Sequence, residues 1–238
     1  GSILLVLGGT WNADGMYLHD LVFTKRLRRL RLVTCIYDMI PVQFPHFTAK
    51  SYYTAFEKHV KTVISVSDRL LAISDCTARV VSEFAAKNRL MAPEVALIRL
   101  GDEIDQVTDV DLERIGALKA QLGARPFVLT VSTITPRKNF EMLYQVWLRL
   151  IERLGDGAPQ LVIVGREGYN ATTLLTTLRD DINVQGHIHI LHDVGDDVLR
   201  WLYCNCLFTV YPTLYEGWGM PVAESLAFGP SPIHMSCS

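Results

Sequence analysis

FVLTVSTITPRKN, residues 127–139, is the stretch that decides the fold class of this chain. It begins with a continuous apolar and β-branched run, which is typical of a strand buried on both faces of a parallel sheet. The residues that follow, 139–154, form a helical pattern whose apolar face consists of Phe140, Leu143, Trp147, Leu150 and Leu154. Because a buried strand leads directly into an amphipathic helix, the segment predicts an α/β fold.

The same alternation continues on both sides of this stretch. Strands are expected on the N-terminal side at 3–7, 32–37, 62–66, 70–73 and 95–100, and on the C-terminal side at 161–164, 188–191 and 207–211. Ser74 is predicted to cap a helix, and a last helix is expected from Met220 to Phe228. We therefore expect two α/β domains, residues 1–105 and 126–238, with a linker at 106–125 that includes a solvated helix.

Composition narrows the class of protein. The chain has 238 residues, of which 49% are hydrophobic and 20% charged, so it can form a sizeable core. A formal net charge of −2 gives no global attraction to nucleic acid, which is not an expected partner. Five cysteines at irregular spacing are interpreted as reduced thiols of a cytoplasmic protein. No apolar run reaches the roughly 20 residues of a membrane-spanning helix.

Two cations follow the strand at 127–133. Arg137 and Lys138 precede the N-terminus of the helix at 139–154, where the helix dipole favours anions rather than cations. An anion bound there by helix amides and by both side chains explains this placement. A solvated basic turn is the alternative.

A second polar loop, YEGWGMPVAE, residues 215–224, opens the last helix. Gly217 and Gly219 allow positive φ and close approach of a ligand, and Pro221 suits a first helical turn. Glu216 in the loop and Glu224 inside the helix offer carboxylates that can accept hydrogen bonds from vicinal hydroxyls. The alternative is a loop acid and a helix acid that are both simply exposed.

Glu216 and Glu224 together resemble the E-x7-E signature of the family 4 glycosyltransferases. VLTVSTITPRKN and LVIVGREGYN are similar to further segments of that family, as are VTCIYDMIPVQFPHF and LLAISDCTARVV nearer the N-terminus. The resemblance implies the GT-B fold, in which two Rossmann-like domains face each other across a cleft. It also implies that this chain is truncated at both ends.

The resemblance also implies roles for individual residues. Arg137 and Lys138 would neutralise the donor diphosphate, Glu224 would hold the ribose, and Glu216 would face the transferred sugar. Glu216, Arg137, Lys138 and Asp38 would form the catalytic group, with Tyr37 and Asp38 on the acceptor side. The implied donor-binding residues are Thr133, Arg137, Lys138, Gly165, Val194, Glu216, Gly217, Gly219, Met220, Pro221 and Glu224.

The implied activity is transfer of a hexose, mannose-type favoured, from a GDP- or UDP-linked donor to a saccharide or lipid-linked acceptor. The family retains anomeric configuration and uses no metal or cofactor. Three departures stand out: Tyr37 where many relatives have His, Ser132 in place of Gly, and an atypical end at 230–238. The missing histidine and the truncation leave room for a catalytically silent nucleotide-sugar-binding subunit of a polysaccharide-assembly complex. Another GT-B enzyme, an epimerase or a phosphorylase, is a third reading.

Two weaker signals remain. The basic run from Lys25 to Arg31 has leucines between its charges, which suits either a solvated helix face or peripheral contact with an anionic membrane. The latter would place the protein on the inner face of the plasma membrane. His187, His189 and His192 cluster, but no carboxylate or thiol stands at a convincing spacing, so no metal site is predicted.

Overall fold

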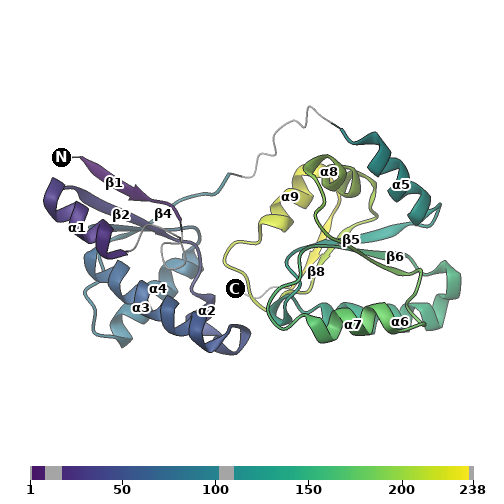
Figure 1. Cartoon of the computed structure of the whole chain (residues 1–238), viewed down its shortest axis with the longest axis horizontal. Coiled ribbons are helices and arrows are strands. Elements are labelled where there is room, and N and C mark those ends of the chain that lie inside the picture. The colour runs from purple at the N-terminus through teal and green to yellow at the C-terminus, as the bar shows by residue number, and fades with distance from the viewer. Residues whose placement is uncertain (1, 9–17, 102–109, 236–238) are drawn as a thin grey trace. The chain divides into compact units, whose positions relative to one another are not determined.

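The computed structural model describes residues 2–8, 18–101 and 110–235. The chain divides into two compact units, the first formed mainly by residues 1–101 and the second mainly by residues 102–237. The first unit contains a four-stranded parallel sheet in the order β1-β2-β3-β4 (Figure 1). Its strands are β1 (Ile3–Val6), β2 (Arg31–Ile36), β3 (Arg69–Ala72) and β4 (Val95–Leu97); its helices are α1 (Leu18–Arg28), α2 (Ile40–Gln43), η1 (Pro45–Phe47), α3 (Lys50–Val66) and α4 (Asp75–Lys87).

Helix α3 corrects one strand expected from the sequence. Residues 62–66, predicted as a strand, form the C-terminal end of this helix. Phe56, Val60, Val63 and Ile64 are its buried residues, and their spacing of four, three and one follows the helical period. A short apolar run does not distinguish a strand from a buried helix by itself. The predicted cap of α4 is confirmed, because Ser74 Oγ accepts a hydrogen bond from the Thr77 amide.

The second unit is built on a five-stranded parallel sheet in the order β7-β6-β5-β8-β9. Its strands are β5 (Phe127–Val131), β6 (Gln160–Val164), β7 (Ile188–Leu191), β8 (Thr209–Tyr211) and β9 (Pro232–His234). Its helices are α5 (Leu112–Leu122), η2 (Pro136–Lys138), α6 (Phe140–Leu154), η3 (Gly155–Gly157), α7 (Thr172–Asp180), α8 (Asp196–Asn205) and α9 (Met220–Phe228).

Helices cover both faces of this second sheet, as the continuous apolar strands predicted. Phe127 and Leu129 pack in one cluster with residues of α5 and α8, while Val128 packs in another with residues of α6 and α7. Figure 1 shows α6 and α7 on one side of the strands and α8 and α9 on the other. Alternate residues of β5 therefore serve two cores, which explains why the whole run is apolar.

Two segments of the second unit differ from the sequence expectation. Helix α5, expected as a solvated helix of a linker at 106–125, has Ile115, Leu118 and Leu122 buried against the sheet. The atypical segment at 230–238 continues the sheet, because β9 pairs in parallel with β8 over its three residues. Hydrogen bonds between main-chain groups form this strand, so an unusual sequence does not prevent it. Residues 236–238 lie outside the described part.

Candidate functional site

Two loops of the second unit are joined at the carboxyl ends of β5 and β8. The Leu214 amide donates to the Arg137 carbonyl at 2.9 Å, and the Arg137 guanidinium donates through Nη1 to the Tyr215 carbonyl. The Thr213 hydroxyl also donates to the Tyr215 carbonyl, at 3.1 Å. Since β5 lies between β6 and β8, the strand order reverses at this point, and ligands of open α/β sheets bind at such reversals.

The basic loop adopts a shape that the sequence did not predict in detail. Pro136, Arg137 and Lys138 form one turn of 3-10 helix, and Asn139, in the left-handed region with φ 57°, starts α6. Arg137 and Lys138 are both half-buried. The guanidinium of Arg137 therefore has a structural role, because its Nη1 donates a hydrogen bond to the Tyr215 carbonyl of the second loop. Its predicted contact with a diphosphate, and that of Lys138, stay predictions.

Gly165 has a packing role in the same region. A Cβ on Gly165 would stand 1.9 Å from the carbonyl oxygen of Ser132, so no larger residue fits there without backbone movement. Gly168, which the sequence reading did not single out, is comparable, because its Cβ would lie 2.8 Å from the methyl carbon of Thr133. Its amide donates to the Ile134 carbonyl at 2.9 Å. The loop after β6 therefore supports the loop after β5, with Thr133 exposed at its rim.

Of the two glycines expected to allow a positive φ before α9, only Gly219 adopts one. Gly219 takes φ 84° just before the helix, and Met220 and Pro221 form its first turn. The left-handed conformation allowed at Gly217 is not adopted, since Gly217 has no positive φ. Trp218 and Met220 are exposed on this loop, and Glu216 is half-buried.

Glu224 is held from the core side by a tyrosine pair. The hydroxyl of Tyr203 donates to Glu224 Oε2 at 3.0 Å, and the Tyr203 and Tyr211 hydroxyls are 3.4 Å apart. Burial is the main cause that raises the pKa of Tyr203 and raises the pKa of Tyr211 to about 12. Both phenols thus stay protonated at neutral pH. The sequence reading missed them, although a buried tyrosine hydroxyl generally needs a polar partner.

Val194 lies beside a cavity of about 220 Å³ between α5 and the end of β7, lined also by Ala117, Gln121 and Val198. Arg114 lines it and donates to the Asp193 carbonyl at 2.8 Å, which fixes the turn before Val194. Asp193 itself has φ 50°, in the left-handed region. Val194 therefore borders a cavity, and its place among the donor-binding residues stays a prediction.

The three clustered histidines are engaged with protein groups. His187 Nε2 is 3.1 Å from Arg125, His189 Nε2 is 2.6 Å from Gln160 Oε1, and His192 Nδ1 is 2.7 Å from the Gly165 carbonyl. Across the described ranges, no group of three or more His, Cys, Asp or Glu side chains is arranged to hold a metal. None of the four described cysteines forms a disulfide, and Cys237 lies outside the described residues.

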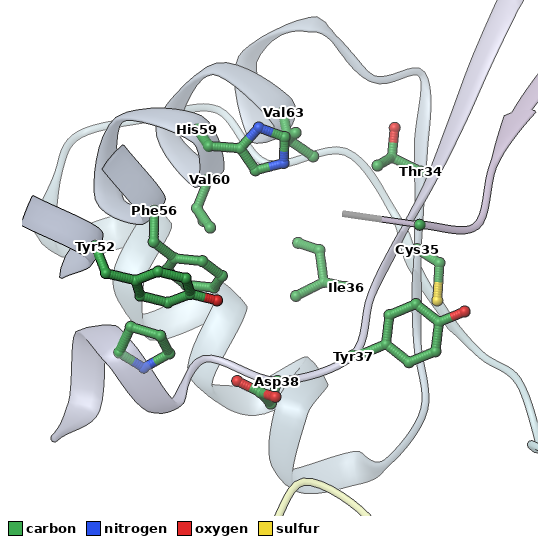
Figure 2. A pocket seen from close by; sticks show the side chains of 12 residues that line it. Thr34, Cys35, Ile36, Tyr37, Asp38, Tyr52, Phe56, His59, Val60 and Val63 are labelled. Atoms are coloured by element: carbon green, nitrogen blue, oxygen red, sulfur yellow. The ribbon is translucent and has the colours of Figure 1, made fainter. Parts of the chain in front are cut away.

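Tyr37 and Asp38 follow β2 in the first unit. The Tyr37 hydroxyl donates to the Leu7 carbonyl at 2.6 Å, and Asp38 Oδ1 accepts from the Ile40 amide at 3.0 Å. Both line a pocket with Tyr52 and His59 of α3, two residues that the sequence reading missed (Figure 2). The sequence analysis predicted a strand at 62–66 and no helix before it. It therefore gave no reason to place Tyr52 and His59 of α3 near the end of β2. Whether Asp38 acts together with Glu216 stays a prediction.

Residues 117–235 match the family model described as glycosyl transferases group 1. The serotype-specific mannosyltransferase WbdA of Escherichia coli is 25% identical over 197 residues, which are 80% of this chain and 24% of WbdA. The O-antigen chain mannosyltransferase B of Escherichia coli is 26% identical over 200 residues, 84% of this chain and 51% of that protein. The chain thus spans a quarter to a half of these relatives.

Solved structures confirm the predicted fold class. Anabaena Alr3699/HepE in complex with UDP and glucose superposes with a TM-score of 0.69 at 16% identity, covering 98% of this chain and 59% of that one. The pneumococcal O-GlcNAc transferase GtfA in complex with UDP and GlcNAc gives 0.64 at 17% identity, covering 98% of this chain and 42% of that one. These neighbours are GT-B proteins, and this chain has the same α/β architecture with parallel sheets.

Proposed function

Since its residues 117–235 match the family model, this chain belongs to the glycosyl transferases group 1 family, and we propose that it transfers a mannose-type hexose from a nucleotide-diphosphate sugar to a saccharide or lipid-linked acceptor. The junction of Arg137 with Tyr215 supports this proposal most directly. It brings the basic loop and the loop of Glu216 together at the strand reversal, where an open α/β sheet binds its ligand. The mannose preference rests on the names of the relatives.

The donor would be held by groups of complementary chemistry. Arg137 and Lys138 would offset the charge of the diphosphate and of the leaving nucleotide, which is the place where a transferase needs stabilisation. Glu224 would accept hydrogen bonds from two ribose hydroxyls, with one carboxylate oxygen already oriented by Tyr203. Because Arg137 and Lys138 would offset the charge that a divalent metal ion otherwise offsets, we propose that the transfer is independent of metal. Retention of anomeric configuration is proposed from the family resemblance alone.

Binding of nucleotides to this chain tests the donor site. GDP, UDP and their mannose and glucose derivatives are titrated by calorimetry, and Glu224→Gln and Lys138→Ala are each expected to abolish measurable binding of the preferred nucleotide. Glu152→Gln and Arg179→Ala, at exposed positions on α6 and α7, are the matched controls and should bind as the parent does. Unchanged affinity in both site variants would show that the donor lies elsewhere.

Transfer distinguishes an enzyme from the silent nucleotide-sugar-binding subunit. The chain is incubated with the nucleotide sugar that it binds and with mannosyl acceptors, and released nucleotide is followed against product. Tight binding without transfer or donor hydrolysis would favour the silent subunit. Transfer that persists in excess EDTA supports metal independence, and transfer that stops on chelation contradicts it. The configuration of the product by NMR then tests retention.

Peripheral membrane contact through Lys25 to Arg31 is a further part of the proposal. Lys25 is engaged with the protein, since its ammonium pairs with Asp68 at 2.8 Å and donates to the Val66 carbonyl. Arg26, Arg28 and Arg29 are exposed, and so are Phe23 and Leu27, one helical turn apart on α1. Exposed apolar and basic side chains on one helix suit an anionic bilayer surface. Among the described helices, none is both long and apolar enough to cross a bilayer.

A further inference from the structure

The turn between β7 and α8, residues 192–197, is held by side chains from outside it. Arg114, in the first part of α5, donates through Nη2 to the Asp193 carbonyl at 2.8 Å and to the His192 carbonyl at 3.4 Å. Asp193 has φ 50°, in the left-handed region that is unfavourable for most L residues. One guanidinium therefore fixes two successive carbonyls at a residue whose backbone conformation needs support.

A second contact joins the N-termini of α5 and α8. Asp197, in the first turn of α8, accepts a hydrogen bond through Oδ2 from the Asp111 amide at 2.7 Å. Asp111 is the N-cap of α5, and its own Oδ1 accepts from the Arg114 amide at 2.8 Å. The bond from the Asp111 amide is the main cause that lowers the pKa of Asp197, so this carboxylate is ionised at neutral pH. Hydrogen bonds to an ionised carboxylate are stronger than those between neutral groups.

The support behind the turn is anchored in the core. Ile115 and Leu118 of α5 are buried in the cluster that also contains Val198 of α8. The polar end of α5 thus belongs to a helix that cannot shift without disturbing closely packed side chains. On its other side the turn meets the loop after β6, because His192 Nδ1 lies 2.7 Å from the Gly165 carbonyl. The turn is therefore fixed on two sides.

We propose that Arg114 and Asp197 are positioning residues of the donor site, which hold the turn at 192–197 so that Val194 keeps its place beside the cavity. The inference rests on the proposed function, because that function supplies the nucleotide. Among the described residues that line the cavity, Val194 and Arg114 occur and Asp197 does not, so Asp197 acts through the turn. Functional sites need such outer support, since a loosely held group binds its ligand poorly.

Nucleotide affinity of the whole chain is the first measurement. GDP and UDP are titrated by calorimetry, and Arg114→Ala and Asp197→Ala are each expected to bind the preferred nucleotide about three- to tenfold more weakly, the size expected for loss of one hydrogen bond. Arg153→Ala on α6 and Asp180→Ala on α7 remove the same charges at exposed positions and should bind as the parent does. Parent-like affinity in both site variants overturns the proposal.

A conservative variant separates positioning from a general loss of structure. Asp197→Asn keeps an oxygen that can accept from the Asp111 amide, so it should restore most of the affinity lost in Asp197→Ala. Hydrogen exchange of the Asp111 amide should be faster than in the parent for Asp197→Ala and close to the parent for Asp197→Asn. An Asp197→Asn protein that binds nucleotide as weakly as Asp197→Ala contradicts the positioning role. Circular dichroism checks folding; if Asp197→Ala does not fold, Arg114→Ala and Arg114→Lys replace the pair, since lysine keeps a donor for one carbonyl.

The outcomes separate this inference from the proposed function. If the parent chain binds nucleotide and the Asp111 amide responds as expected, but affinity is the same in every variant, the turn does not position the donor. The inference then fails and the donor site stands. If the parent chain binds neither GDP nor UDP, the donor assignment itself fails, and the positioning role is rejected with it. Weaker binding in both alanine variants that Asp197→Asn reverses supports both proposals.

Discussion

The Tyr203 hydroxyl donates a hydrogen bond of 3.0 Å to Glu224 Oε2, from the buried face of α8 to the half-buried first part of α9. Tyr203 is fully buried and contacts Tyr211 as well, so the carboxylate is oriented by a rigid neighbour. One carboxylate oxygen is thereby fixed, which leaves the other oxygen for a ligand. A residue that the sequence treated as ordinary core thus positions a residue expected at the donor site.

Tyr203→Phe is predicted to weaken nucleotide binding roughly threefold to tenfold, because one hydrogen bond contributes about 1 kcal/mol. The donor KM should rise with little change in kcat, since the phenol orients Glu224 and contacts no reacting atom. Tyr169→Phe, at an exposed tyrosine, is the control. An equal effect of the two variants on nucleotide affinity would show that Tyr203 does not act through Glu224.

Gly165→Ala is predicted to lower the free energy of unfolding by about 1–3 kcal/mol, the range for forced overpacking. The added methyl would stand 1.9 Å from the Ser132 carbonyl oxygen, which must then move. Gly157→Ala is the control, since a Cβ there meets nothing within 4 Å and no positive φ is required. Urea unfolding of both variants is measured. A Gly165→Ala protein as stable as the control would contradict the close packing of these two loops.

Arg137→Lys is predicted to loosen the loop at 213–215 and to weaken nucleotide binding, although the charge is kept. A lysine loses the planar guanidinium that reaches the Tyr215 carbonyl. Lys138→Arg, which also keeps its charge, is expected to have the smaller effect. Hydrogen exchange of the Leu214 amide, which donates to the Arg137 carbonyl, reports on the loop. If the Leu214 amide exchanges faster only in Lys138→Arg, then Lys138 rather than Arg137 holds the loop at 213–215.

Stability is predicted to fall as the pH drops from about 6.5 to 4. Burial holds the pKa of His59 near 4 in the folded chain, below the unfolded value near 6.5, so the unfolded state binds more protons in that window. His189, whose pKa is also lowered mainly by burial, acts in the same direction. The stability conferred by a neutral His59 is therefore complete above pH 6.5 and lost on acidification.

His59→Gln should flatten this pH dependence, and His46→Gln should not. Thermal unfolding between pH 7 and 4.5 is compared for the parent and the two variants. The carboxylates with lowered pKa values, such as Asp68 beside Lys25, lose their contribution mostly below this range. An identical slope in all three proteins would show that His59 is not buried as a neutral imidazole.

Much of the fold was predictable from local pattern. The helix from Met220 to Phe228 was predicted with its bounds, because glycines flank it and Pro221 fits its first turn. The strands β5 and β6 were predicted since an apolar run beside Gly or a polar loop has few other interpretations. The strand expected at 62–66 was wrong, because an apolar run at the end of α3 shows its helical period only when the preceding turns are included.

The sequence by itself determined the residue types that matter: two cations before one helix and two carboxylates around another, each after a buried strand. Only the tertiary structure decided how they are held. Arg137 and Tyr215 meet across 78 residues because β8 pairs with β5 rather than with β7, a choice that depends on long-range packing. Tyr203 and His59 reach their sites through the faces of α8 and α3 that turn inward. Local pattern carries the period of an element, but its partners depend on how the whole chain packs.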